Sequence, residues 1–128
     1  MSELMITRSF LALTALMFVA FGFWSITDPA GMTARLGVTA GGTSGLFEMR
    51  GIFGGVSLGA ACLCALGALR ARFEFAALCF IAAYMGGYVL GRGASFLYGD
   101  TALQSNWIFA GFEAVMFVIA ATLAARRS

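Results

Sequence analysis

Apolar residues form four long runs along the chain, and short polar or glycine-rich segments separate them. Each run has close to the roughly 20 residues that an α-helix needs to cross the hydrocarbon core of a bilayer. Arginines, an Asp-Pro step and glycines lie between the runs, where helices commonly end. We therefore predict an all-α fold, an up-and-down bundle of four transmembrane helices at about Ser9–Ile26, Phe47–Leu69, Phe73–Leu90 and Asn106–Ala125.

The segments between the runs differ in character. The Asp28-Pro29 step ends the first helix, because a proline disfavours helical geometry in the residue before it. The third helix is expected to end at the Gly91-Arg92-Gly93 segment. The remaining linkers are predicted as one or two interfacial helical turns at Ala30–Leu36, a loop at Gly37–Gly45 and a second loop at Ala94–Ser105.

Composition supports a chain that lies in lipid. Of the 128 residues, 61% are apolar and 11% are charged, and the mean hydropathy is +0.92. A soluble domain has about a quarter charged residues, so this chain could not cover a water-exposed surface. We expect one domain over residues 1–128, with the bilayer as its surroundings.

Several kinds of chemistry are excluded by what the sequence lacks. The net charge is only +2 and the basic residues are scattered, which argues against nucleic-acid binding. The chain has no His and no Lys, so it offers neither imidazole ligands for a metal or haem nor an amine for a Schiff base. We expect no metal and no cofactor.

Arginines are distributed unequally between the two ends of the predicted helices. Cytoplasmic flanks of transmembrane helices carry an excess of Arg and Lys. With four spans, three segments fall on one side, and they carry Arg8, Arg70 with Arg72, and Arg126 with Arg127. Both termini are therefore expected to be cytoplasmic, with Arg35, Arg50 and Arg92 towards the other side.

Four charged residues lie within or at the ends of the predicted helices, near their non-cytoplasmic ends: Glu48, Arg50, Arg92 and Glu113. A charge inside a bilayer costs at least a few kcal/mol and usually faces the protein interior. Our hypothesis is a neutral cluster of the two acids and the two arginines, with Asp100 in a loop at the same level. The cytoplasmic half is expected to hold no ionisable group except the cysteines.

Helical spacing indicates which way some of these groups point. Glu48 shares one helix face with Gly51, Gly55 and Gly59, which recur every four residues and which we call the glycine strip. Small residues at this spacing allow two helices to approach closely. We expect Glu48 at the top of a packed seam that could also join two copies of the chain. Arg50 lies about 200° from Glu48 around the helix, so the two are not expected to pair.

Two further faces carry polar groups. Tyr84, Tyr88 and Arg92 follow each other at four-residue spacing, so the tyrosine rings could stack on the guanidinium or their hydroxyls could bind a carboxylate. Asn106 and Glu113 share one face of the last helix. We predict that Glu113 and Glu48 are the candidates for proton transfer. The candidate ligand-binding residues are Arg50, Arg92, Tyr84, Tyr88, Asn106 and Asp100.

The segment Phe47–Gly55, the Gly91-Arg92 step with Ser95 and Gly99, and the acidic Glu113 together resemble a family of small bacterial membrane proteins. That family is catalogued as domain of unknown function 4345 and is distantly similar to DoxX-like four-helix proteins. Asp100-Thr101-Ala102 departs mildly from the family pattern. The resemblance implies a multi-pass protein of the bacterial inner membrane, and it implies no particular reaction.

Three functions remain open from the sequence. The first is binding of a hydrophobic or amphipathic small molecule, of isoprenoid or quinone type, with proton transfer by Glu113 if a reaction occurs. The second is an oligomeric transporter or proton-coupled channel, in which Glu113 is the carrier site. The third is an accessory subunit of a membrane complex. The same charged cluster could also serve only to stabilise the bundle.

Overall fold

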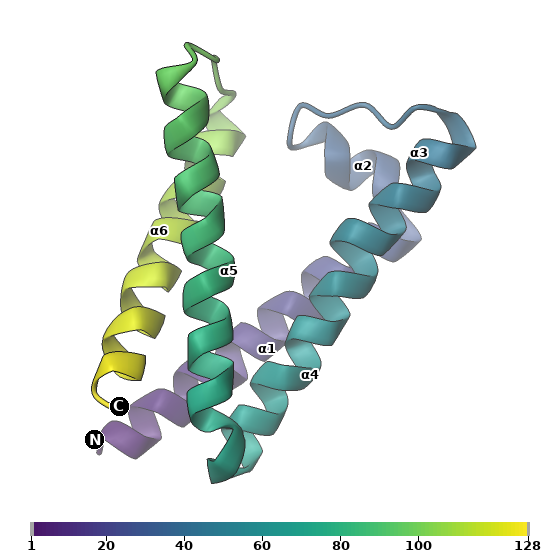
Figure 1. The fold of residues 1–128 in the computed structure, drawn as a ribbon. Coiled ribbons are helices and arrows are strands. Elements are labelled where there is room, and N and C mark those ends of the chain that lie inside the picture. The colour runs from purple at the N-terminus through teal and green to yellow at the C-terminus, as the bar shows by residue number, and fades with distance from the viewer. Residues whose placement is uncertain (1, 128) are drawn as a thin grey trace. The chain divides into compact units, whose positions relative to one another are not determined.

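The computed structural model describes residues 2–127, so Met1 and Ser128, the ends of the predicted domain, lie outside the described residues. Within that range the chain is all-α and contains no strand. Four helical stretches are long and apolar enough to cross a membrane, which confirms the predicted fold class. The elements are α1 (Glu3–Thr27), α2 (Pro29–Ala34), α3 (Gly42–Met49), the π-helix η1 (Arg50–Gly55), α4 (Val56–Leu69), α5 (Ala71–Leu97) and α6 (Gln104–Ala125). Figure 1 shows their order along the chain.

Large apolar side chains lie on the outside of every long helix. Leu13, Leu90 and Ile108 are each about two-thirds exposed or more. Soluble proteins rarely expose apolar surface on this scale. In lipid such side chains need no covering, so the exposed faces are those of a multi-pass membrane protein.

The third helix is longer than its sequence pattern predicts. It continues through the Gly91-Arg92-Gly93 segment, which we expected to end it, and stops at Leu97. Glycine permits a helix even though it weakens one by about 1 kcal/mol. The helix ends where Gly99 adopts a left-handed conformation (φ 83°), and the amide of Asp100 then bonds to the Ser95 carbonyl. The predicted loop at Ala94–Ser105 is therefore much shorter.

The other boundaries shift by a few residues. The Asp28 carboxylate accepts a hydrogen bond from the Gly31 amide and caps α2, so the first helix ends at Thr27 and the short helix begins at Pro29, each within one residue of the prediction. The loop predicted at Gly37–Gly45 is shorter, because α3 starts at Gly42. α3, η1 and α4 follow one another without a break and form one spanning stretch, Gly42–Leu69.

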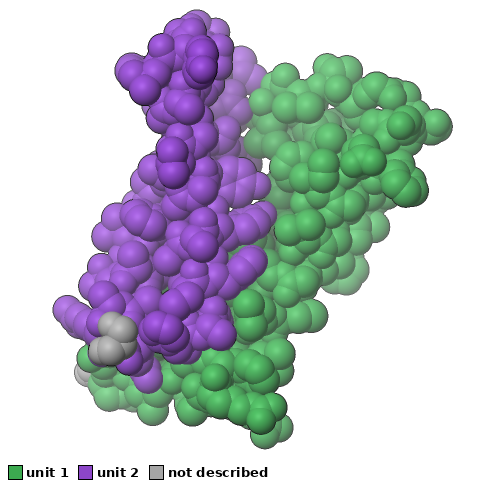
Figure 2. Space-filling model, viewed as in Figure 1, with its two compact units in different colours: residues 1–74 green, residues 75–128 purple. Residues whose placement is uncertain are grey.

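The chain divides into two compact units, residues 1–74 and residues 75–128, which Figure 2 colours separately. In the first unit α1 packs antiparallel against η1 and α4. Gly22 and Gly54 face each other where these helices meet. A Cβ added to Gly54 would lie 2.5 Å from Ile26, and one added to Gly22 would lie 2.9 Å from Leu58. A side chain larger than hydrogen at either position would therefore have to displace Leu58 or Ile26.

The glycine strip does not form the seam that we predicted within this unit. Gly51, Gly55 and Gly59 are exposed, and the buried glycine of this stretch is Gly54. The turns from Arg50 to Gly55 are π-helical, with the Val56 amide bonded to the Gly51 carbonyl five residues back. Because glycines occur on two sides of this helix, spacing alone could not decide which of them meets α1.

The second unit is an antiparallel pair made by α5 and α6 (Figure 1). Three contacts set its register: Gly86 lies against the Phe117 ring, Arg92 pairs with Glu113, and the rings of Phe96 and Trp107 meet edge to face. The distance along α5 from Gly86 to Phe96 matches the distance back along α6 from Phe117 to Trp107. Gly86 permits the close approach, since an added Cβ would lie 2.9 Å from Phe117.

Candidate functional site

Arg92 and Glu113 form a bidentate ion pair inside the second unit. The Arg92 Nε and Nη2 groups donate to the Glu113 Oε1 and Oε2 atoms, each at 3.0 Å. The Glu113 side chain is only 9% exposed, and it lies about 13 Å along α6 from the start of that helix. Such a fork is the strongest geometry for this kind of pair. Each carboxylate oxygen therefore accepts a hydrogen bond from Arg92.

The predicted aromatic stripe on α5 supports this arginine. The Arg92 guanidinium lies over the Tyr88 ring, 5.6 Å from its centre. Tyr88 in turn meets Tyr84 edge to face at 5.3 Å, and Tyr84 stacks on Phe80 at 5.4 Å. The four residues follow one another at four-residue spacing, so a single helix face holds the cation in place.

Two further predicted ligand-binding residues have local structural partners. The Asp100 carboxylate accepts a hydrogen bond from the Ser95 hydroxyl in the turn after α5. The Asn106 side-chain oxygen accepts from the Leu103 amide at 2.9 Å, in the first turn of α6. Both side chains thus satisfy backbone or hydroxyl groups at helix ends, a common use of Asp and Asn.

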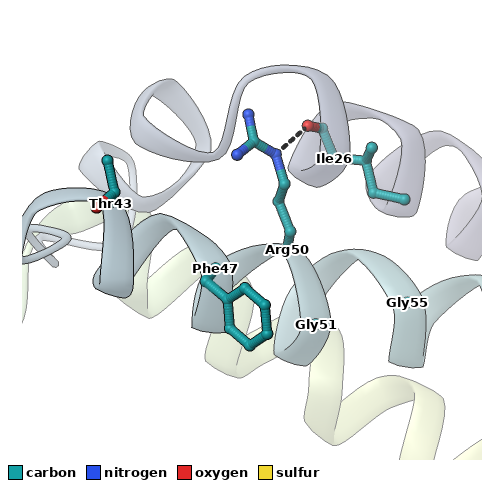
Figure 3. A pocket seen from close by; sticks show the side chains of 6 residues that line it. All are labelled: Ile26, Thr43, Phe47, Arg50, Gly51 and Gly55. Atoms are coloured by element: carbon teal, nitrogen blue, oxygen red, sulfur yellow. Dashed lines mark hydrogen bonds between the residues drawn. The ribbon is translucent and has the colours of Figure 1, made fainter.

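Arg50 has different surroundings, in the first unit. Its Nε donates to the Ile26 carbonyl at 2.9 Å (Figure 3). Ile26 is in the last turn of α1, where carbonyl oxygens have no partner within the helix and the helix dipole is negative. The sequence correctly predicts that Arg50 does not pair with Glu48. Within residues 2–74, the terminal nitrogens of Arg50 have no hydrogen-bond partner.

An open pocket of about 520 Å³ lies beside Arg50 (Figure 3), and we call it the Arg50 pocket. Apart from the guanidinium and one hydroxyl, its lining is apolar or backbone. Arg50 and Gly55, the two ends of the π-helix, both contribute to it. π-Helical turns are rare and are frequent at functional sites. The lining residues are Ile26, Thr43, Phe47, Arg50, Gly51 and Gly55.

Glu48 lies on the surface of the first unit. It is exposed and, within residues 2–74, forms no ion pair. The predicted place for Glu48 at the top of a packed seam is therefore wrong for this unit. The four charges of the predicted cluster divide between the units: Arg92 and Glu113 neutralise each other in one, and Arg50 and Glu48 have separate surroundings in the other.

A buried acid that was not predicted from the sequence lies at the opposite end of the first unit. Glu74, in the first turn of α5, is 2% exposed, and its Oε1 lies 3.8 Å from the Arg8 Nε atom. The expectation that this half holds no ionisable group except cysteines is wrong. Opposite charges near the starts of the first and third apolar runs were the signal that could have revealed the pair.

Comparison with known protein families identifies the family of this chain. No curated protein and no solved structure matches it significantly. The model of the family described as "Domain of unknown function (DUF4345)" matches residues 6–124, nearly the whole chain and parts of both units. The residues that suggested this resemblance, from Phe47 to Glu113, lie within the match. The chain therefore belongs to the family of domain of unknown function 4345.

Proposed function

We propose that this membrane protein binds an amphipathic molecule with an anionic head, which lies at Arg50 while the apolar part lies in the Arg50 pocket. One observation carries the proposal. The Ile26 carbonyl orients the guanidinium through its Nε and leaves both terminal nitrogens available beside an apolar pocket. A planar pair of N–H groups suits a carboxylate or a phosphate.

Electrostatics favours an anionic head over a neutral one. The Ile26 carbonyl is a dipole and does not neutralise Arg50, whereas Arg92 has a full carboxylate partner. A cation near hydrocarbon without a counter-ion is costly. An anionic ligand would supply the missing charge, and a quinone or a neutral isoprenoid would not.

The geometry supports binding more than it supports catalysis or proton transport. Glu113, which we considered as the proton donor or carrier, uses both oxygens in its bond to Arg92. Proton transfer would require this pair to open, which costs roughly 2–3 kcal/mol because Arg92 is partly exposed. The pair acts instead as a fixed link between α5 and α6.

We also propose the orientation in which both termini face the cytoplasm, in a bacterial inner membrane. The arginine distribution supports it, since five of the eight arginines flank the ends on that side. Arg50 then lies near the outer surface of the membrane. Anionic lipids or fatty acids of the outer leaflet would reach the Arg50 pocket directly.

Trp24 allows a direct test, because it lies within one helical turn of Ile26 and is partly exposed. In a Trp107→Phe background it is the only tryptophan. The protein is reconstituted in phosphatidylcholine vesicles that contain a small fraction of brominated phosphatidylglycerol or brominated phosphatidylcholine. We expect stronger quenching of Trp24 fluorescence by the brominated anionic lipid.

Variants of Arg50 identify the cause of that preference. Arg50→Gln should abolish it, because no cation remains at the pocket. Arg50→Lys should keep part of it, since a lysine supplies the charge without the planar pair of donors. Arg35→Gln removes the same charge from the end of α2 and should change little. Equal quenching by both lipids, or a preference that survives in Arg50→Gln, would refute the proposal.

A further inference from the structure

The Arg50 pocket lies along one face of a continuous helical stretch. Four of its lining residues follow one another at four-residue spacing: Thr43, Phe47, Gly51 and Gly55. Arg50 is seven residues after Thr43, which is close to two helical turns, so the two side chains share a face about 10 Å apart along the axis. Figure 3 shows Phe47 between them. Arg50 therefore comes from the middle of the lining and not from its end.

The hydroxyl group of Thr43 is available to a ligand in this pocket. Several helical hydroxyls of the first unit bond within their own helix: those of Thr14, Ser25 and Thr33 each donate to the carbonyl oxygen four residues back, at 2.7–2.9 Å. Thr43 is the second residue of α3, so the residue four positions back lies outside the helix. Within residues 2–74 the Thr43 hydroxyl forms no hydrogen bond.

The polar groups of the pocket have a definite order along the membrane-spanning stretch Gly42–Leu69. Thr43 is nearest the end of that stretch, and Arg50 follows. Beyond Arg50, towards the middle of the stretch, the helix contributes no polar side chain to the lining. The apolar part of a ligand lies on that side, because the middle of the span lies in hydrocarbon. A ligand that fills the whole pocket therefore carries a polar group on the other side of its anion.

We propose that the ligand of the Arg50 pocket is a phosphodiester lipid whose head alcohol carries a hydroxyl group: its phosphate binds Arg50 and its hydroxyl binds Thr43. This inference rests on the proposed function and adds the class of anion. In a phosphodiester lipid the anion lies between the head alcohol and the apolar chains, which matches the order of groups in the pocket. In a fatty acid or a phosphate monoester the anion is the terminal group, so Thr43 would have no partner.

Phosphatidylglycerol and phosphatidic acid are the matched probes for this difference. Both have the same acyl chains and a phosphate, and only phosphatidylglycerol has a head alcohol with hydroxyl groups. A brominated form of each is added to phosphatidylcholine vesicles that contain the Trp107→Phe protein, and the quenching of Trp24 fluorescence is followed. The mole fraction that gives half of the maximal quenching measures the binding of each lipid.

Thr43→Val removes the hydroxyl group and keeps the shape of the side chain. We expect it to raise the half-maximal mole fraction of phosphatidylglycerol by about 2-fold to 10-fold, the effect of one hydrogen bond. The value for phosphatidic acid should not change. Thr43→Ser keeps the hydroxyl and should keep the selectivity. The matched control is Ser44→Ala, which removes a hydroxyl from the adjacent residue outside the pocket lining and should change neither value.

The outcomes separate this inference from the proposed function. If neither anionic lipid quenches Trp24 more strongly than brominated phosphatidylcholine does, both are overturned. If both anionic lipids bind and Arg50→Gln abolishes their binding, the proposed function holds. An effect of Thr43→Val that is absent, or equal for the two lipids, then overturns only the assignment of the ligand as a hydroxylated phosphodiester.

Two competitors test the lipid class against other sources of an anion. Hexadecanoate has an apolar chain and a terminal carboxylate, and glycerophosphoglycerol has the phosphodiester head without chains. Neither should displace brominated phosphatidylglycerol as efficiently as unlabelled phosphatidylglycerol does at the same amount. Equal displacement by hexadecanoate would show that a terminal anion is sufficient. Equal displacement by glycerophosphoglycerol would show that the ligand is a water-soluble diester. Either result overturns the inference.

Discussion

Arg50 in the first unit and Arg92 in the second each lie within a long helical stretch, and the two arginines have different partners. Arg92, in the second unit, donates hydrogen bonds from two nitrogens to the Glu113 carboxylate and lies over the Tyr88 ring. Its charge is therefore neutralised and its position is fixed. Arg50, in the first unit, donates a hydrogen bond from one nitrogen to the Ile26 carbonyl, which does not neutralise its charge. A carboxylate partner makes an arginine structural, whereas a carbonyl partner orients it and leaves it able to bind an anion.

The units also differ in what holds their helices together. In the first, glycines bring two backbones into contact at Gly22 and Gly54. In the second, an ion pair and an aromatic stripe add to the contact of Gly86 with Phe117. A substitution that removes one of these contacts should therefore lower the free energy of unfolding by a different amount in each unit. A different second substitution should restore it in each case.

The largest effect is expected from Glu113→Gln. It leaves Arg92 without a counter-ion, and breaking a buried pair costs about 3–5 kcal/mol; partial exposure of Arg92 reduces this to roughly 2–3 kcal/mol. Unfolding in mixed detergent micelles, followed by circular dichroism, measures the loss. The double variant Arg92→Met/Glu113→Leu should recover most of it, because no charge is left unpaired. A stable single variant would show that the pair is not the link we describe.

An intermediate effect is expected from Gly54→Ala in the first unit. The new methyl group would lie 2.5 Å from Ile26, and overpacking of this kind costs about 1–3 kcal/mol. The same unfolding measurement applies. Gly55→Ala, one residue further along the helix, is the control and should be neutral or slightly stabilising, because its Cβ meets only open space and one distant oxygen. Ile26→Ala should rescue Gly54→Ala. Equal effects at both glycines would contradict the proposed crossing.

The smallest effect is expected from Tyr88→Leu. It removes the ring beneath Arg92 but leaves the bond to Glu113, and a partly exposed cation–π contact contributes about 0.5–1 kcal/mol. A double-mutant cycle with Arg92→Met measures the coupling of the two side chains. Zero coupling would mean that the stripe packs without supporting the arginine.

Local patterns predicted much of this architecture and part of the site. Four apolar runs of sufficient length predicted four spanning helices, and the four-residue spacing of Tyr84, Tyr88 and Arg92 predicted their shared face. The continuation of α5 past Gly91 and Gly93 was not predictable from local signals, because glycine is compatible with both a turn and a helix. Glu74 was overlooked for a similar reason: its position near the edge of an apolar run does not say whether packing buries it.

The sequence by itself determined that this protein lies in a bilayer, where its helices are, and which charged residues need a partner within lipid. Those properties follow from hydropathy and helical period, which are local. The partners of the charges depend on which helix faces meet, and only the tertiary structure decided that Arg92 bonds to Glu113 while Arg50 bonds to a carbonyl. The same holds for the glycines, because a π-helical segment and the approach of α1 selected Gly54 for packing and left the glycine strip open.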